Sequence, residues 1–223
     1  MLELILPAEV VSRECFGEAS DAVLLPEEEQ IITNAVQSRR REFAAVRNLA
    51  RDCLGRLGYP PVAILPGPGG APAWPAGVQG SMTHCIGYAA AAVGPCPAIL
   101  GIGIDAEPDA PLPDGVLDLV ATHVEQDRLT VIRREADGPH WDRLLFSAKE
   151  AIYKAWFPVV GEWLDHHEAE IVFDPHGQTF SAQLSRDGLI INGHQIHCLQ
   201  GRWTRKQGIL ATAVVLSAGR CAC

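Results

Sequence analysis

The sequence has 223 residues, of which 48% are hydrophobic and 20% charged, and it carries a formal net charge of −9. This composition is ordinary for a globular protein that buries a substantial core. The acidic balance argues against nucleic-acid binding, and no apolar run approaches the ~20 residues of a membrane-spanning helix, so we expect neither nucleic-acid nor membrane partners. The first residues include no basic region of a secretory signal, which predicts a cytoplasmic protein.

Seven cysteines are scattered along the chain, an odd number in a sequence without a secretion signal. Such cysteines are typically reduced thiols in a reducing compartment, and we expect the same here. They are Cys15, Cys53, Cys85, Cys96, Cys198, Cys221 and Cys223.

Two helices are predicted in the first quarter of the chain. Leu25-Pro26-Glu27-Glu28-Glu29 has proline and acidic residues in a first turn, where they suit the helix dipole. A second helix is predicted from about Ser38 to Leu57, with Gly58 as its stop. Its core-facing side chains recur at helical spacing, and they are Phe43, Val46, Ala50, Cys53, Leu54 and Leu57.

The other face of this second helix is basic. Arg40, Arg47 and Arg51 fall within a narrow arc and repel one another unless an anion or acidic side chains lie among them. Two interpretations stay open: an anion site, or a solvated basic face paired with Glu42 and Asp52.

A short strand is predicted at 62–65, and the proline- and glycine-rich segment 66–77 that follows is predicted to be a loop. This loop is not a Walker-type phosphate cradle, because it lacks the Gly-Lys-Ser/Thr ending. Strand patterns return at 80–88 and 89–93. His84 lies in the first of them, and a single histidine there is more often a satisfied polar residue than a catalyst.

The most distinctive strand is predicted at 99–108, where Asp105 and Glu107 follow a run of glycines and isoleucines. Side chains two apart share a face of a strand, so these carboxylates project the same way. Two adjacent carboxylates favour the binding of a cation. The alternative is that the Asp-x-Glu before the proline is only the polar end of a strand, where the chain leaves the core and becomes exposed to solvent.

Helices are predicted next at 116–120 and 124–132, and a longer one from Pro139 to Trp156, stopped by Phe157-Pro158. On the long helix Glu150 and Lys154 lie one turn apart on one face. The opposite, core-facing stripe consists of Leu144, Ala148, Ile152 and Ala155.

A third carboxylate, Glu150, can therefore join Asp105 and Glu107, with the Lys154 ammonium beside it. Three carboxylates suit a hard ion such as Mg²⁺, which takes oxygen ligands and shares its shell with substrate phosphates. The alternative is a solvated Glu150/Lys154 helix pair worth a few tenths of a kcal/mol, roughly 0.3.

The last third of the chain is predicted to be mainly strands, at 169–173, 179–184, 189–191, 196–199 and 209–216. Helices and strands mix without a regular βαβ rhythm, which predicts an α+β fold with two similar α/β lobes in a pseudo-two-fold arrangement. We place the boundary at the Gly94-Pro95-Cys96-Pro97 turn, which gives an N-terminal lobe at 1–97 and a C-terminal lobe at 98–223.

The two central motifs together resemble the paired signature of the 4′-phosphopantetheinyl transferases, in their long, single-chain, pseudo-dimeric class. They are Gly101-Ile102-Gly103-Ile104-Asp105-Ala106-Glu107-Pro108 and Phe146-Ser147-Ala148-Lys149-Glu150-Ala151-Ile152-Tyr153-Lys154-Ala155-Trp156. Supporting motifs occur in the family's order at 38–47, at Pro72-Ala73-Trp74-Pro75 and at Gly80-Ser81-Met82-Thr83-His84-Cys85. The resemblance implies the fold described above and transfer of the phosphopantetheine arm of coenzyme A to a carrier-protein serine, with release of adenosine 3′,5′-bisphosphate.

The same resemblance implies roles for the acidic strand and the long helix. Asp105, Glu107 and Glu150 would be the Mg²⁺ ligands, and Lys154 would contact the pyrophosphate of coenzyme A. The carrier serine needs a base within hydrogen-bond reach, for which Glu150 is the candidate, so Glu150 and Lys154 are the predicted catalytic residues.

In the N-terminal lobe the resemblance implies contacts of Arg39, Arg47 and His84 with the nucleotide phosphates of coenzyme A. Helix geometry instead favours Arg40 beside Arg47, and we choose Arg39 because register is least certain at a helix start. Some relatives carry a lysine in the glycine-rich stretch, whereas residues 66–71 contain none.

The expected partners are apo acyl, polyketide or peptidyl carrier proteins of fatty-acid, polyketide or nonribosomal-peptide synthesis, and we expect a monomer. Carriers are typically acidic, so we look for the docking face beside Lys149 and Lys154. Two other functions remain possible: a different Mg²⁺-dependent phosphoryl-transfer enzyme or nuclease, and a carrier-binding module without catalysis.

Overall fold

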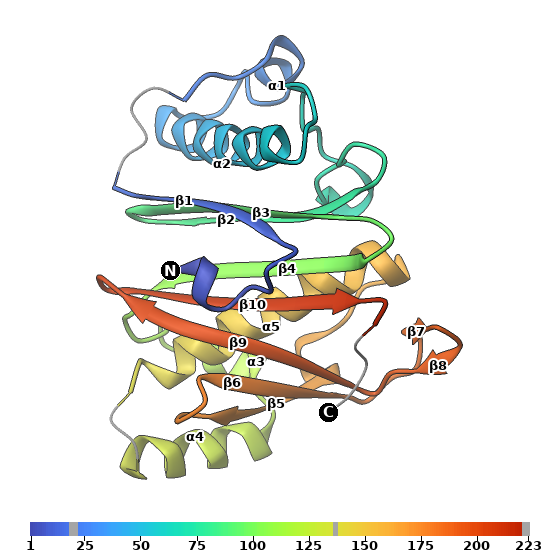
Figure 1. The fold of residues 1–223 in the computed structure, drawn as a ribbon. Helices are drawn as coiled ribbons and strands as arrows, with labels where there is room; N and C mark the ends of the chain where they lie inside the picture. The colour runs from blue at the N-terminus through green and yellow to red at the C-terminus, as the bar shows by residue number, and fades with distance from the viewer. Residues whose placement is uncertain (18–21, 136–137, 220–223) are drawn as a thin grey trace.

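The fold is that of a computed structural model, in which residues 1–17, 22–135 and 138–219 are described. It is α+β, as predicted, with helices packed on two antiparallel sheets (Figure 1). A three-stranded sheet has the order β1-β3-β2, and a five-stranded sheet has the order β4-β10-β9-β6-β5.

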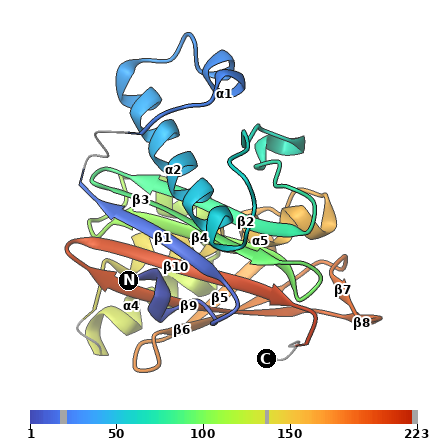
Figure 2. The same cartoon turned by 45° about the horizontal axis from the view of Figure 1, so that its top comes forward.

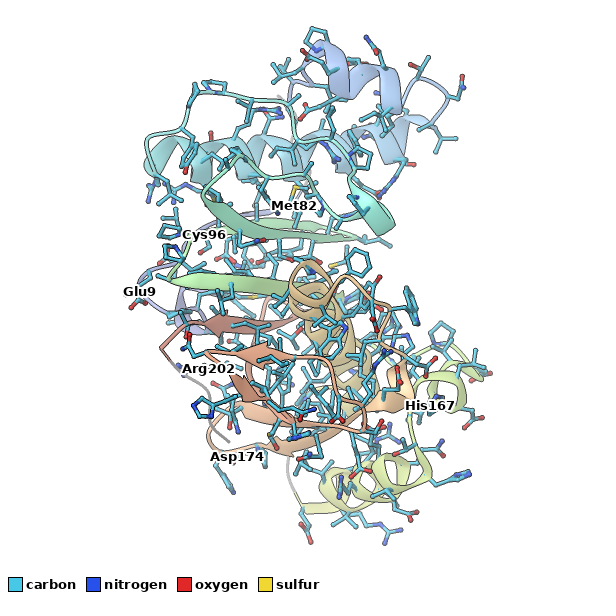
Figure 3. All side chains as sticks on the ribbon, turned by 90° about the vertical axis from the view of Figure 1, so that its right-hand side faces the viewer. Glu9, Met82, Cys96, His167, Asp174 and Arg202 are labelled. Carbon is cyan, nitrogen blue, oxygen red and sulfur yellow. The ribbon has the colours of Figure 1, made fainter. Side chains whose placement is uncertain are left out.

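The N-terminal half places α2 across the three-stranded sheet (Figure 2). The small side chains of β3 leave the helix close to the strand, and Met82 of β2 lies in this layer (Figure 3). The elements of this half are β1 (Val11–Phe16), α1 (Pro26–Ile31), α2 (Gln37–Arg56), β2 (Val78–Cys85) and β3 (Tyr88–Pro95), with 3₁₀ turns at Leu2–Leu4 and Pro68–Gly70.

The C-terminal half places α5 against the five-stranded sheet, where Trp156, Ile152 and Leu144 of the helix are buried in the main core. Its elements are β4 (Ile99–Pro108), α3 (Val116–Val120), α4 (His123–Glu135), α5 (Trp141–Val160), β5 (Ala169–Asp174), β6 (Thr179–Leu184), β7 (Ile190–Ile191), β8 (His194–Gln195), β9 (Cys198–Lys206) and β10 (Ile209–Ser217), with a 3₁₀ turn at His166–Glu168. The hairpin β7-β8 stands apart as a two-stranded sheet.

The two halves meet where β2 and β4 run side by side (Figure 1), although these strands belong to separate sheets. Side-chain hydroxyl groups bond the strands together here. Ser81 Oγ accepts the backbone N–H of Ile104 at 3.1 Å, and Thr83 Oγ1 accepts that of Ala106 at 3.0 Å. The acidic end of β4 therefore lies at the junction of the two halves.

Several predicted boundaries are wrong. Residues 62–65 form no strand, because the backbone there bonds side chains of α1 and α2 instead of a sheet partner. The strand β1 was not predicted, and β9 runs to Lys206, well beyond the predicted 196–199. The helix α5 continues through Pro158, because a proline in the last turn removes one hydrogen bond, and Gly161 N still bonds Phe157 O at 2.8 Å.

The prediction of reduced cysteines holds for Cys15, Cys53, Cys85 and Cys96, which are free thiols. It is wrong at Cys198, which is disulfide-bonded; cysteine spacing along a chain does not reveal which sulfur atoms the fold brings together. The predictions for Cys221 and Cys223 lie outside the described residues. Within the described ranges no helix has the length and hydropathy to cross a membrane.

Candidate active site at the junction of the two halves

A cavity of about 760 Å³ lies between α2, the glycine-rich loop, β2 and α5. The loop reaches α5 at Gly69, where an added Cβ would lie 2.4 Å from the Phe157 ring. The cavity is lined by residues of both halves, among them Arg39, Arg47, His84, Glu150, Tyr153, Lys154 and Phe157. Five of the predicted site residues therefore share one cavity.

Arg39 and His84 lie side by side at the cavity wall. Arg39 Nη1 is 2.8 Å from His84 Nε2, and a guanidinium can only donate, so the neutral ring accepts this hydrogen bond. Burial, together with the charge of Arg39, holds the pKa of His84 below its ordinary value of 6.5. Glu42 Oε2 lies 3.2 Å from the same nitrogen and acts in the opposite direction.

Arg47 is more deeply placed, with 6% of its surface exposed. Its Nε donates to Ile64 O at 3.0 Å, and its guanidinium carbon lies 3.1 Å from the centre of the Phe43 ring. Burial lowers the pKa of Arg47 to about 10, which leaves the side chain charged at pH 7. Glu28 Oε1, 3.9 Å away, partly balances that charge.

The other two arginines of the basic face have acidic partners on α1. Both carboxylate oxygens of Glu28, which is fully buried, lie 2.8 Å from Arg51 Nη1. Arg40 bonds Glu29 and the carbonyl oxygen of Ile32. Acids do lie among the arginines, as one interpretation required, but they are not the predicted partners Glu42 and Asp52.

Asp105 is buried at the end of β4, where its two carboxylate oxygens have different surroundings. Oδ1 lies 2.7 Å from Lys154 Nζ and accepts a 3.3 Å hydrogen bond from Thr83 Oγ1. Oδ2 is buried and has no hydrogen-bond partner among the described residues. On β10, opposite Asp105, Thr212 bonds Ser147 of α5, which attaches the helix beneath this point.

The remaining two predicted metal ligands flank Asp105. Burial and the charge of Asp105 raise the pKa of Glu107, which forms a 3.0 Å ion pair with Arg143. Burial is also the main cause that raises the pKa of Glu150, and Asp105 adds to it. His166 Nε2 lies 3.9 Å from Glu150 Oε1.

This group of carboxylates has the chemistry that Mg²⁺ prefers. The negative charge of Asp105 disfavours ionisation of Glu107 and Glu150. In addition, Oδ2 of Asp105 is buried without a hydrogen-bond partner among the described residues. A bound cation would offset the repulsion between the carboxylates and give this oxygen a partner. Across the described residues no group of three or more His, Cys, Asp or Glu side chains is gathered closely enough to hold a metal ion. Mg²⁺ commonly uses one or two carboxylates, with water and substrate phosphates, so the residues present fit it.

The structure corrects one prediction about the protein surface. Lys149 is only 2% exposed, so it cannot form part of a docking face. Its Nζ lies 2.8 Å from Glu125 Oε2 and donates to His166 O at 2.6 Å. The interaction of Arg143 with Glu107 and that of Thr83 with Asp105 were not predicted, because both join residues more than 20 positions apart.

Comparisons with known proteins identify the family of the chain. A family model described as the 4′-phosphopantetheinyl transferase N-terminal domain matches residues 27–94, and one described as the 4′-phosphopantetheinyl transferase superfamily matches residues 101–203. The 4′-phosphopantetheinyl transferase Svp of Streptomyces mobaraensis is 45% identical over 221 residues, covering 98% of this chain and 90% of its own.

Two further relatives are similar over nearly their whole length. PptT of Mycobacterium tuberculosis is 43% identical over 220 residues, covering 95% of this chain and 96% of its own. Npt of Nocardia iowensis is 45% identical over 222 residues, covering 96% of this chain and 99% of its own, and both carry the name 4′-phosphopantetheinyl transferase. The chain therefore belongs to the 4′-phosphopantetheinyl transferase superfamily and is an enzyme of that class.

Proposed function

We propose that the protein moves the 4′-phosphopantetheine arm of coenzyme A to a serine hydroxyl of an apo carrier protein and releases adenosine 3′,5′-bisphosphate. One observation carries the proposal. A single cavity is lined by cationic side chains from both halves and by Glu150, and the buried Asp105 lies beside it, paired with Lys154. Such a cavity suits a substrate with phosphates at two places along its length.

The cationic wall would bind the phosphates of the nucleotide. Arg39, Arg47 and His84 lie on the N-terminal side of the cavity and are the proposed contacts. Lys154 projects from α5 and is the proposed contact for the pyrophosphate. Residues 1–97 would thus hold the nucleotide end, and residues 98–223 the reacting end.

Asp105, Glu107 and Glu150 are the proposed source of the Mg²⁺ ligands, and one or two of these carboxylates would hold the ion together with water and substrate phosphates. The ion would supply positive charge to the pyrophosphate, which disperses the charge that develops in phosphoryl transfer. Lys154 now forms an ion pair with Asp105, so it is close to the same place. Arg143 neutralises Glu107 in a similar way.

Glu150 is the proposed base for the carrier serine. Its raised pKa makes its carboxylate a better proton acceptor than an exposed glutamate. The serine oxygen forms a bond to the phosphorus that carries the pantetheine, and the bridging P–O bond breaks. The serine proton passes to Glu150, and the leaving phosphate stays with the adenosine, where Lys154 balances its charge.

The proposed partners are apo acyl, polyketide or peptidyl carrier proteins, and the proposed working state is a cytoplasmic monomer. A single chain provides both sides of the cavity, which supports the monomer.

The direct test is the intact mass of a panel of apo carrier proteins after incubation with the enzyme, coenzyme A and Mg²⁺. We expect a gain of one phosphopantetheine that is lost with chelator and in Glu107→Ala. Glu3→Ala is the matched control, because Glu3 is exposed and does not line the cavity. This variant should transfer phosphopantetheine as the wild type does. If no carrier gains mass while coenzyme A still binds, the protein is a binding module and the proposal is wrong.

A further inference from the structure

The junction of β2 and β4 contains two buried hydroxyl groups in equivalent positions. Ser81 and Thr83 are two residues apart on β2, with 3% and 4% of their surfaces exposed. Each accepts one backbone N–H of β4, from Ile104 and Ala106 respectively. The two side chains therefore make the same connection between the strands.

They differ in what lies on their other side. A hydroxyl group has one proton, and because the Ala106 N–H occupies an acceptor site of Thr83, that proton remains to be donated. Asp105 Oδ1 lies 3.3 Å away and receives it. A hydrogen bond to a carboxylate is stronger than one between neutral groups. Ser81 has no carboxylate within hydrogen-bond distance among the described residues.

This hydrogen bond helps to set the orientation of the Asp105 carboxylate. Thr83 and Lys154 both approach Oδ1, from β2 and from α5. Oδ2 is left buried and unpaired, although a buried carboxylate oxygen normally has a partner. An orientation that directs both fixed donors to one oxygen presents the other oxygen to a ligand.

We propose that Thr83 is a positioning residue that orients Asp105 for the metal ion, and that it links this orientation to the alignment of β2 with β4. The inference rests on the proposed function, because it takes Asp105 as a ligand of Mg²⁺. Thr83 touches neither the substrate nor the ion in this assignment. Groups that orient metal ligands typically contribute about 10- to 100-fold to metal affinity.

The test uses the full chain and three variants. Thr83→Val removes the hydroxyl but keeps the shape, and Thr83→Ser keeps the hydroxyl. Ser81→Ala removes the equivalent strand connection, and because Ser81 also lines the cavity, its coenzyme A affinity is measured as well. Mn²⁺ serves as the probe, and its dissociation constant is measured by electron paramagnetic resonance with saturating coenzyme A. Affinity for coenzyme A without metal, thermal stability and the metal dependence of kcat are measured alongside.

We expect Thr83→Val to raise the Mn²⁺ dissociation constant about tenfold. Its metal-free coenzyme A affinity should stay within about twofold of the wild type, and saturating metal should restore most of kcat. Ser81→Ala should lower the melting temperature as much as Thr83→Val does, without the loss of metal affinity. Thr83→Ser should behave as the wild type.

The inference is overturned if Thr83→Val and Ser81→Ala change metal affinity by the same factor, or if Thr83→Val leaves it unchanged. It is also overturned if the wild type binds no Mn²⁺ with coenzyme A present. A wild type that binds Mn²⁺ in the expected order of variants but modifies no carrier would contradict the proposed function and support the role of Thr83.

Discussion

A Cβ atom added at Gly103 would lie 1.7 Å from the carbonyl oxygen of Ala151, so β4 and α5 approach each other too closely for any side chain there. The nearest atoms belong to the backbone of α5, which cannot move aside as a flexible side chain can. The same helix carries Glu150 and Lys154, so a shift of the helix would displace both side chains. Gly103→Ala should therefore destabilise the protein by about 3 kcal/mol or more, and it should lower activity by displacing the helix.

Chemical denaturation of Gly103→Ala measures this cost. Gly55→Ala is the control, because an added Cβ there meets nothing within 4 Å and Gly55 lies inside α2. It should stabilise the protein by about 0.5–1 kcal/mol, since alanine favours helix over glycine. Equal stabilities of the two variants would show that β4 and α5 leave room for a side chain at Gly103, which would contradict the close approach of the two elements.

The buried ion pair between Lys149 and Glu125 should be strongly coupled. Both side chains are about 1% exposed, and Glu125 also accepts the backbone N–H groups of Thr122 and Ile171. Lys149→Met leaves a buried charge without its partner, which should cost about 3–5 kcal/mol.

A double-mutant cycle with Glu125→Gln separates the pair from the capping contacts. Lys149→Met/Glu125→Gln should be more stable than the sum of the single effects, because no unpaired charge remains. Additive effects in urea denaturation would mean that the two charges do not interact in the folded protein.

Binding of adenosine 3′,5′-bisphosphate should take up a proton at His84. Burial and Arg39 hold the pKa of His84 below 6.5 in the free enzyme, and a bound phosphate raises it by favouring the charged ring. Between the free and bound pKa values the ring is neutral before binding and protonated after it. Affinity should therefore increase as the pH falls through this range.

Calorimetric titrations near pH 6.5, in buffers of different ionisation enthalpy, count the protons taken up. His84→Asn is the control, because protonation of the ligand itself is the same for both proteins. The wild type should take up more protons than His84→Asn, by at most one. Identical proton uptake would show that His84 does not sense the phosphate.

Glu150 should reduce the stability of the free enzyme at neutral pH. Its pKa is raised in the folded state, so the folded state binds more protons than the unfolded state between the two values. The contribution of Glu150 to stability is fully present below about pH 4.5, the ordinary pKa of a glutamate. It is lost as the pH rises through the raised pKa of Glu150 in the folded state. Glu150→Gln does not titrate, so its melting temperature should exceed that of the wild type increasingly over this range.

The same variant should lose at least about 100-fold in kcat if Glu150 is the base. Glu3→Gln, at an exposed position, should change neither property. A melting-temperature difference that does not depend on pH would contradict the raised pKa, and retained activity would contradict the proposed base.

Local sequence pattern predicted much of the architecture. The helix α2 begins within one residue of its predicted start, β4 has its predicted bounds, and α5 contains the predicted face with Glu150 and Lys154. These elements have periodic side chains, and periodicity depends on residues a few positions apart. The resemblance to the family likewise rested on two short motifs of consecutive residues.

The residue pattern alone therefore predicts which faces of the helices and strands are apolar and which are charged, and the two motifs indicate the family. The folded structure, in contrast, was needed to show that Arg51 bonds Glu28, that the buried Lys149 pairs with Glu125, and that Thr83 donates to Asp105 across the junction of β2 and β4. Each of these contacts joins residues more than 20 positions apart. Their pairing depends on how helices and sheets pack as whole bodies, and no local pattern carries that information.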